Sequence, residues 1–195
     1  MKTNPKSKPE STSPQPLLVQ WWQQWAENIK ILVLALGLAF FIRTFIAEPR
    51  YIPSESMLPT LEIGDRLIVE KLSYYSHLPQ RGDIVVFEPP PQLQSQGYLV
   101  DQAFIKRVIG LPGDTVEVKN GRVSIDRQVL TEAYIAAPPN YLMSPIVVPP
   151  EELFVMGDNR NNSNDSHIWG FLPKANVIGH ACFRFWPLER LGGMR

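Results

Sequence analysis

The sequence TVEVKNGRVSI at residues 115–125 is the strongest local folding signal in this chain. Apolar and polar residues alternate on both sides of Asn120-Gly121, as in two strands that are each buried on one face. Asn-Gly is a preferred pair for a two-residue type I′ turn, because both positions need a positive φ. The stretch therefore predicts a β-hairpin.

Short apolar runs on either side of this hairpin predict further strands. These runs are residues 67–69, 84–87, 103–109, 153–156 and 181–185. The first two follow Gly64-Asp65 and Gly82-Asp83, which are typical turn residues. Two proline-rich stretches, residues 89–97 and 136–150, are expected to form loops or extended covering segments. We therefore expect a mainly β domain built from antiparallel sheet.

Upstream of the β pattern, residues 31–42 read ILVLALGLAFFI and carry no charge. A run of this length is typical of a core helix or of the apolar part of a signal peptide. Lys30 and Arg43 flank it, however, and such long side chains can extend their charges away from apolar surroundings. Residues 25–46 as one helix would span roughly 33 Å. The residues after the run also lack the Ala-x-Ala spacing of a cleavage site. We therefore expect one uncleaved transmembrane helix in the lipid bilayer.

The composition around this run divides the chain into three parts. Residues 1–16 are almost free of apolar side chains and predict a disordered tail. Residues 17–47 should form an interfacial segment and the transmembrane helix, with Trp21, Trp22 and Trp25 as an aromatic belt, although a helix packed on the domain's own core is an alternative. Residues 48–195 should form the β domain. The lysines before the span favour a cytoplasmic N-terminus and an extracytoplasmic β domain.

Composition excludes several classes of protein. The formal net charge is zero, so a basic surface for nucleic acid is not expected. Cys182 is the single cysteine, which excludes an internal disulfide and a cysteine-built zinc site. No glycine-rich phosphate loop follows a predicted strand, and we expect no metal and no cofactor.

Residues 52–61, IPSESMLPTL, contain a candidate nucleophile. Pro53 and Pro59 restrict the backbone on either side of two serines. Ser54 and Ser56 are two residues apart, so their hydroxyls point the same way in an extended segment. The alternative interpretation is a plain surface loop, because proline and serine are common in loops.

A serine nucleophile needs a base, and the candidates are His77, His167, His180 and the lysines. Among these, Lys106 and His167 have supporting sequence around them. In the strand expected at residues 103–109, Lys106 shares a face with Phe104 and Val108. Apolar surroundings lower the pKa of an amine, and a neutral lysine can accept the serine proton. The alternative is a surface lysine in a strand whose apolar face is Ile105 and Ile109.

The second candidate lies in the polar run at residues 157–167, which follows a predicted strand. Asp165 and His167 could complete a Ser-His-Asp triad with Ser56. The charged residues Asp158, Arg160 and Asp165 could instead be structural partners of other buried charges, or the run could be a hydrogen-bonded surface loop.

Three blocks of sequence, taken in order, resemble bacterial type I signal peptidases in their single-span form. The blocks are IPSESMLPTLEIGD at residues 52–65, IKRVIGLPGD at residues 105–114 and MGDNRNNSNDSHIWG at residues 156–170. Together with the span before the first block, they extend the resemblance over about residues 31–186. The resemblance implies a signal-peptidase-like antiparallel β domain as the catalytic domain.

The resemblance also implies roles for individual residues. Ser56 would be the nucleophile and Lys106 the general base, with the Ser54 hydroxyl and the Ser56 N–H forming the oxyanion hole. Ser163 would orient the lysine amine, and Arg107 with Asp158 would form an ion pair near the site. Small side chains of the substrate would fit pockets lined by Ile52, Met57, Leu61 and Ile105.

The sequence departs from the family pattern at two of these positions. Glu55 stands where glycine is common, next to the expected oxyanion hole. His167 stands where arginine is common, and a histidine would make a contact with Asp165 sensitive to pH near neutrality.

The implied activity is that of a membrane-bound serine endopeptidase with a Ser-Lys dyad. It would remove signal peptides from exported preproteins after small residues in Ala-x-Ala, on the periplasmic or lumenal side. One alternative is a non-catalytic, membrane-anchored β domain that binds partners. Another is a Ser-Lys protease of the self-cleaving repressor kind, which would need an N-terminal DNA-binding domain. The sequence leaves the oligomeric state open.

Overall fold

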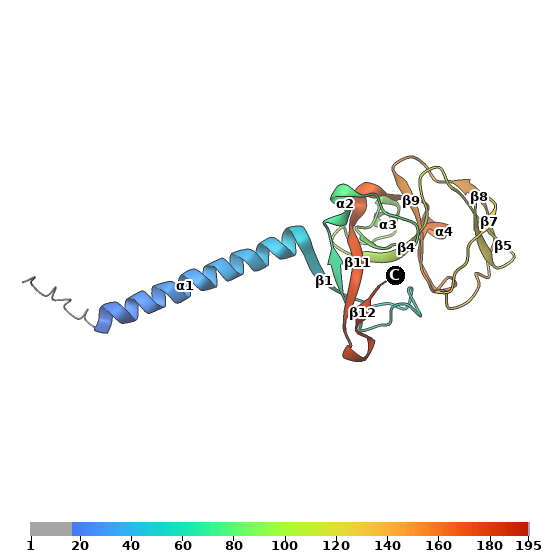
Figure 1. Cartoon of the computed structure of the whole chain (residues 1–195). Coiled ribbons are helices and arrows are strands. Elements are labelled where there is room, and N and C mark those ends of the chain that lie inside the picture. Colours follow the sequence, from blue (N-terminus) through green and yellow to red (C-terminus); the bar gives the residue numbers. More distant parts are fainter. Residues whose placement is uncertain (1–16, 195) are drawn as a thin grey trace, which may run out of the picture. The chain divides into compact units, whose positions relative to one another are not determined.

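The computed structural model describes residues 17–194, and within them one long helix precedes two antiparallel β sheets (Figure 1). The expected disordered tail at residues 1–16 lies outside the described residues. Besides the long helix, the helical elements are short. They are α2 (Ser73–Ser76), α3 (Pro91–Gln94), α4 (Ser166–Trp169), and the 3-10 turns Lys174–Asn176 and Leu188–Arg190.

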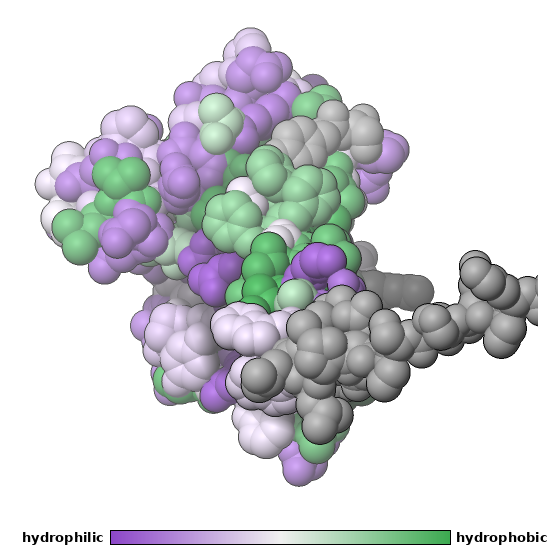
Figure 2. All heavy atoms as spheres, turned by 90° about the vertical axis from the view of Figure 1, so that its left-hand side faces the viewer, coloured by the Kyte–Doolittle hydropathy of each residue, from purple (hydrophilic) through white to green (hydrophobic). Residues whose placement is uncertain are grey.

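The long helix, α1, runs from Leu17 to Phe41 and continues into a π-helical turn at Ile42–Ile46. Its segment Trp25–Ile46 has 22 residues and a mean hydropathy of 2.2, so its length and composition suit a membrane span. Figure 2 views this helix from its N-terminal side, with its hydrophobic side chains in green. These side chains are exposed, including Leu34 at 74%. The helix expected from the uncharged run is confirmed.

The π-helical turn is bound to the strands that follow it. The Lys71 N–H donates to the Ile46 carbonyl at 2.8 Å, and the Lys71 amine lies 3.3 Å from the Arg43 carbonyl. The compact β unit begins at Ile42, and the boundary at residue 48 between the membrane segment and the catalytic domain stays a prediction.

The larger sheet has the strand order β1-β2-β11-β3-β4-β9-β10, and β12 pairs with β11. Every pair is antiparallel. The strands are β1 (Ala47–Tyr51), β2 (Arg66–Glu70), β3 (Ile84–Phe87), β4 (Phe104–Gly110), β9 (Glu152–Met156), β10 (Leu172–Pro173), β11 (Val177–Trp186) and β12 (Gly192–Gly193). All the strands predicted from apolar runs are present, while the two-residue strands and β1, an edge strand that contains Pro49, had no such signal.

The smaller sheet is built on the predicted hairpin. Strands β5 (Thr115–Lys119) and β6 (Arg122–Ile125) pair with Lys119 opposite Arg122, and Asn120 and Gly121 have φ values of 53° and 71°. The type I′ hairpin is confirmed. Strands β7 (Gln128–Val129) and β8 (Met143–Val147) complete the order β7-β6-β5-β8.

The expectation that residues 136–150 form only loop or covering segment was wrong, because they contain β8. This strand pairs with β5 through its backbone. Its sequence MSPIV contains a proline and shows no alternation of buried and exposed residues. Pairing with a formed neighbour, rather than its own pattern, therefore makes it a strand.

Strand β4 lies between β3 and β9 and joins the hydrophobic clusters of the β unit. Its residues contribute to three clusters, with Ile105 in the first, Val108 in the second and Ile109 in the third. From Ile105 onward every residue of β4 is buried. Both faces of this strand are therefore inside the domain, and its charged side chains must be paired or held in the interior.

Candidate active site

The candidate nucleophile lies in a loop between the paired strands β1 and β2. The Ile52 N–H donates to the Asp65 carbonyl at 2.9 Å, and the Gly64 N–H donates back to the Ile52 carbonyl at 3.0 Å. From Glu55 the chain turns, and the side chains of Met57 and Leu61 are fully buried in the core. This anchoring leaves Ser54 exposed and Ser56 half-buried, with their hydroxyl oxygens 3.3 Å apart.

The amine of Lys106 meets this loop from the middle of β4. Its Nζ lies 2.8 Å from Ser56 Oγ and 2.9 Å from the Ile105 carbonyl. Only 3% of Lys106 is exposed, so the alternative of a surface lysine was wrong. The strand has no solvent face here, which a period-two pattern cannot reveal.

Burial sets the protonation of this amine. Loss of water around the charged form lowers the pKa of Lys106 from 10.5 to about 8, against the opposing effect of the carboxylates Asp165 and Asp158. Near pH 8 a large share of the amine is therefore neutral, and its lone pair can accept the proton of the Ser56 hydroxyl.

A second loop, residues 157–163, supports the backbone of Ser56 from the other side. The Asn159 N–H donates to the Ser56 carbonyl at 3.1 Å, and Asn159 Nδ2 donates to the Glu55 carbonyl at 3.1 Å. At Gly157 a Cβ atom would lie 2.3 Å from Ser163 Oγ and 2.4 Å from the Ser56 carbonyl oxygen. Only glycine permits this close approach of the two loops.

Asp165 and His167 form a pair of their own, apart from the serine hydroxyl. His167 Nδ1 lies 2.6 Å from Asp165 Oδ1, and the His167 ring stacks on Tyr141 with centroids 4.2 Å apart. The buried Asp165 also accepts from the Gly157 N–H at 2.8 Å. The sequence left open whether His167, which stands where arginine is common in the family, contacts Asp165. The structure shows this contact. Because Ser56 Oγ contacts Lys106, the geometry favours Lys106 over His167 as its base.

Comparison with known proteins identifies the family. Residues 25–186 match Peptidase_S26, described as signal peptidase, peptidase S26. The chain belongs to this family. It is 64% identical to the probable signal peptidase I-1 of Synechocystis sp. over 88% of this chain and 87% of that protein. It is 59% identical to a signal peptidase I of Leptolyngbya laminosa over 85% and 82% of the two chains.

A crystal structure of a signal peptidase I from Enterococcus faecalis V583 is 32% identical, with a TM-score of 0.45, and covers 53% of this chain and 97% of that one. Membership of the S26 family makes the protein a peptidase that removes signal peptides from preproteins. This family membership excludes the two alternatives of a non-catalytic binding domain and of a self-cleaving repressor.

The signal peptidase has a cavity of about 530 Å³ beside the Ser56 hydroxyl and the Lys106 amine. Of the four expected pocket residues, Ile105 lines this cavity, whereas Ile52, Met57 and Leu61 lie in the core behind it. The pocket role of these three side chains stays a prediction. The other lining residues are Pro53, Ser54, Glu55, Tyr98, Gln102, Ala103, Phe104, Asn162 and Asn164.

Tyr98 and Gln102 were not found as site residues from the sequence. They lie just beyond the proline-rich stretch at residues 89–97, which was expected to form a loop or an extended covering segment. Their position next to this stretch is the one sequence feature that could have indicated them. Asn164, the residue that follows the loop supporting Ser56, has its Nδ2 3.4 Å from the Tyr98 hydroxyl.

The expected ion pair lies behind the cavity of the signal peptidase. Arg107 Nε donates to Asp158 Oδ1 at 2.8 Å, and Arg107 Nη2 donates to Asp158 Oδ2 at 2.7 Å, with both side chains buried. Arg107 Nη1 also donates to the Gly82 carbonyl at 2.8 Å. The pair joins β4 to the start of the second loop, so it fixes the two elements that hold Lys106 and support Ser56.

One expected contact is not made in this arrangement. Ser163 Oγ is buried and has no hydrogen-bond partner within residues 17–194. The residues described also contain no group of three or more His, Cys, Asp or Glu side chains arranged to hold a metal ion.

Proposed function

We propose that Ser56 is the nucleophile and Lys106 the general base of this signal peptidase. The observation that carries the proposal is the 2.8 Å distance between Ser56 Oγ and a buried lysine amine. Neutral Lys106 takes the hydroxyl proton as Ser56 Oγ bonds to the scissile carbonyl carbon, whose oxygen becomes an oxyanion. The Ser54 hydroxyl and the Ser56 N–H are proposed to donate to that oxyanion.

The remaining steps return the enzyme to its starting state. Collapse of the intermediate breaks the carbon–nitrogen bond, and the protonated Lys106 gives its proton to the leaving amine. Water then attacks the acyl-enzyme, with Lys106 again accepting a proton, and the ester bond to Ser56 breaks. The apolar Ile105 and Phe104 in the cavity wall support specificity for small side chains before the cut.

We further propose that Trp25–Ile46 crosses the lipid bilayer with the N-terminus in the cytoplasm and the β domain on the periplasmic or lumenal side. Its length of 22 residues, about 33 Å as helix, supports a single span. The lysines that precede it support the orientation. An extended signal-peptide cleavage region would then meet Ser56 outside the cytoplasm.

The proposal is tested with the full chain in detergent and a preprotein that carries Ala-x-Ala. Mass determination of the products should show one cut directly after the second alanine, and none with Ser56→Ala. A matched preprotein with leucine in place of both alanines should remain uncut. Cleavage by Ser56→Ala, or equal cleavage of both preproteins, contradicts the proposal. In sealed vesicles, cleavage of preprotein added on the side of the N-terminus contradicts the topology.

The pKa of Lys106 predicts an alkaline pH profile. Activity should rise through an apparent pKa near 8, because kcat/KM follows the base of the free enzyme. The stability effect has a definite sign. Since the folded chain binds fewer protons than the unfolded chain between pH 8 and 10.5, stability should increase with pH across this window. The penalty below the window is about 3 kcal/mol.

This profile is measured as kcat/KM between pH 5.5 and 10, with an unfolding curve at each pH. Lys106→Met is the matched control for stability, since it keeps most of the length of the side chain without a titrating group. An acid limb near pH 6.5 would indicate a histidine as the base and would contradict the lysine assignment.

We propose that Ser163 orients the Lys106 amine during the reaction. An amine offers three positions for hydrogen bonds, and two are used by Ser56 Oγ and the Ile105 carbonyl. Ser163 Oγ is buried without a partner in the loop that contacts Ser56. Ser163→Ala should lower kcat by about 10²-fold with a smaller change in KM.

Stability distinguishes this role from a structural one. Ser163→Ala should not lower the free energy of unfolding, because its hydroxyl makes no hydrogen bond to lose. The matched control is Ser166→Ala, which removes an acceptor of the buried Val155 N–H at 3.0 Å and should cost stability instead. A Ser163→Ala enzyme with normal kcat would show that this loop is only structural.

A further inference from the structure

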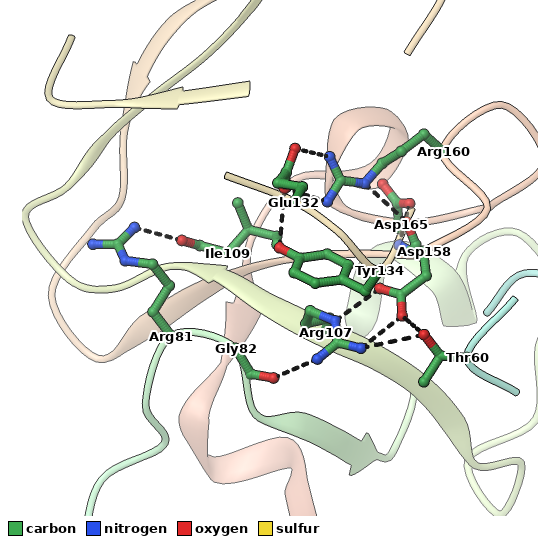
Figure 3. A network of polar contacts seen from close by, with 11 residues as sticks. Thr60, Arg81, Gly82, Arg107, Ile109, Glu132, Tyr134, Asp158, Arg160 and Asp165 are labelled. Atoms are coloured by element: carbon green, nitrogen blue, oxygen red, sulfur yellow. Dashed lines mark hydrogen bonds and ion pairs between the residues drawn. The ribbon is translucent and has the colours of Figure 1, made fainter. Parts of the chain in front are cut away.

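A tyrosine outside the catalytic loops lies between two arginines of the site. Figure 3 shows the Tyr134 ring between Arg107 on one side and the Glu132–Arg160 pair on the other. The Arg107 guanidinium carbon lies 4.1 Å from the centroid of this ring, and that of Arg160 lies 6.0 Å away. Tyr134 is contributed by the connection between β7 and β8 in the smaller sheet. It thus links the second sheet to the ion pairs behind the site.

The edges of both guanidinium groups are occupied, which leaves their faces for other contacts. Arg107 binds Asp158 with two parallel hydrogen bonds and the Gly82 carbonyl with a third. Arg160 donates to both oxygens of Glu132, at 2.9 and 2.6 Å, and to the Gly157 carbonyl at 3.0 Å. At 4.1 Å the Tyr134 ring covers the face of Arg107, where it attracts the positive charge.

Tyr134 is itself held at both ends of its segment. Its hydroxyl donates to Glu132 Oε1 at 3.0 Å, and two residues later the Ala136 N–H donates to the Asp158 carbonyl at 3.2 Å. The backbone from Asp158 to Asn159 then reaches the Ser56 carbonyl. The ring therefore contacts a network that ends at the backbone of the nucleophile and at the strand of the base.

We propose that Tyr134 is a positioning residue for signal-peptide cleavage, because its ring holds the Arg107 guanidinium against Asp158 and keeps that carboxylate neutralised beside Lys106. This inference rests on the proposed roles of Ser56 and Lys106. The hydrogen bonds at the edge of the Arg107 guanidinium give the ion pair with Asp158 its strength. The Tyr134 ring excludes water from the face of the guanidinium.

Removal of the ring would open Arg107 to water. A cavity of about 390 Å³ already borders Arg107 and Tyr134, and its other titratable groups are Arg81, Asp83 and His180. With the ring gone, this space would extend over the guanidinium and weaken its pairing with Asp158.

The charges around Lys106 give the direction of the effect. The carboxylates Asp158 and Asp165 both favour its charged form. Asp165 has His167 as its partner, and Asp158 has Arg107. Weaker pairing of Asp158 would leave more negative charge near the amine. The acid limb of kcat/KM should therefore move to higher pH.

The test varies the ring while keeping its shape. Tyr134→Phe removes only the hydroxyl and should retain activity within about threefold, since Glu132 keeps both bonds to Arg160. Phenylalanine analogues with one, two and three fluorine atoms at position 134 weaken the attraction for a cation stepwise at nearly constant size. Along this series the apparent pKa of the acid limb of kcat/KM should rise by about half a pH unit in total. The value of kcat should fall, while KM should stay within about twofold.

Tyr134→Leu, which removes the aromatic face, should lower kcat by roughly tenfold. All variants are measured as the full chain in detergent, with thermal unfolding alongside. An acid limb and a kcat that stay constant through the fluorinated series overturn the inference, even if Tyr134→Leu fails to fold. Ser56→Ala is assayed in parallel: if it cleaves, the proposed dyad fails, whereas an inactive Ser56→Ala with a flat series means that Tyr134 alone is wrongly assigned.

Discussion

Replacement of Lys106 by alanine is expected to lower kcat by roughly 10⁴-fold while the β unit still folds. The amine is the hydrogen-bond partner of the Ser56 hydroxyl at 2.8 Å, so the variant leaves the nucleophile without a base. Truncation also removes a charge that burial disfavours, so the free energy of unfolding should fall little, or rise, near neutral pH. Cleavage is measured on a preprotein with Ala-x-Ala, and folding by circular dichroism.

Two further variants sharpen this result. Lys106→Arg should be inactive at every pH, because a guanidinium does not deprotonate. His167→Ala should retain substantial activity, because His167 contacts Asp165 and Tyr141. Lys174→Ala is the matched control for loss of a lysine, since Lys174 pairs with the exposed Glu151 and neither residue lines the cavity beside Ser56. If His167→Ala were inactive and Lys106→Ala active, a Ser-His-Asp triad would replace the dyad.

Replacement of Asp158 by alanine is expected to destabilise the folded protein by about 3–5 kcal/mol, the usual cost of leaving a buried charge without its partner. Arg107 would keep only its bonds to the Gly82 carbonyl and Thr60. The loss should appear as a lower midpoint of chemical unfolding of the full chain in detergent. Activity should fall as well, because Asp158 precedes Asn159 in the loop that supports the Ser56 carbonyl.

A surface pair provides the control for this prediction. Glu151, 85% exposed in its side chain, pairs with Lys174, and Glu151→Ala should cost less than about 1 kcal/mol. The double variant Arg107→Met with Asp158→Leu removes both charges and should recover much of the stability without recovering activity. Equal midpoints for Asp158→Ala and Glu151→Ala would mean that the buried pair contributes no more than a surface one.

Local sequence was sufficient where local chemistry determines the backbone. Asn120-Gly121 predicts a type I′ turn because few other residues accept a positive φ at both positions. The run Ile84–Phe87 predicts its strand because four adjacent apolar residues fit a strand buried on both faces. Strand β8 could not be predicted in this way, since its proline-containing sequence becomes a strand only against β5.

The site was predictable to the extent that its residues lie in recognisable blocks. Ser56, Lys106 and the ion pair of Arg107 with Asp158 belong to such blocks, and the structure brings them together. The position of Lys106 inside the domain could not be read from alternation, because both faces of β4 are buried. Tyr134 had no signal at all, since its contact with Arg107 joins a residue in the connection between β7 and β8 to a strand of the other sheet.

The adjacency of Lys106 and Arg107 on a strand buried on both faces makes the registry of β4 a determinant of chemistry. Val85 faces Lys106 on β3, and Met156 faces Arg107 on β9. A displacement of one residue in one direction would bring the permanently charged Arg107 to the serine and Val108 to Asp158, and in the other direction it would bring Ile105 to the serine and Lys106 to Asp158. A single-residue insertion or deletion upstream in β4 would thus abolish proton transfer and break the ion pair at once. A point substitution can alter proton transfer or the ion pair separately, whereas a change in the length of β4 alters both.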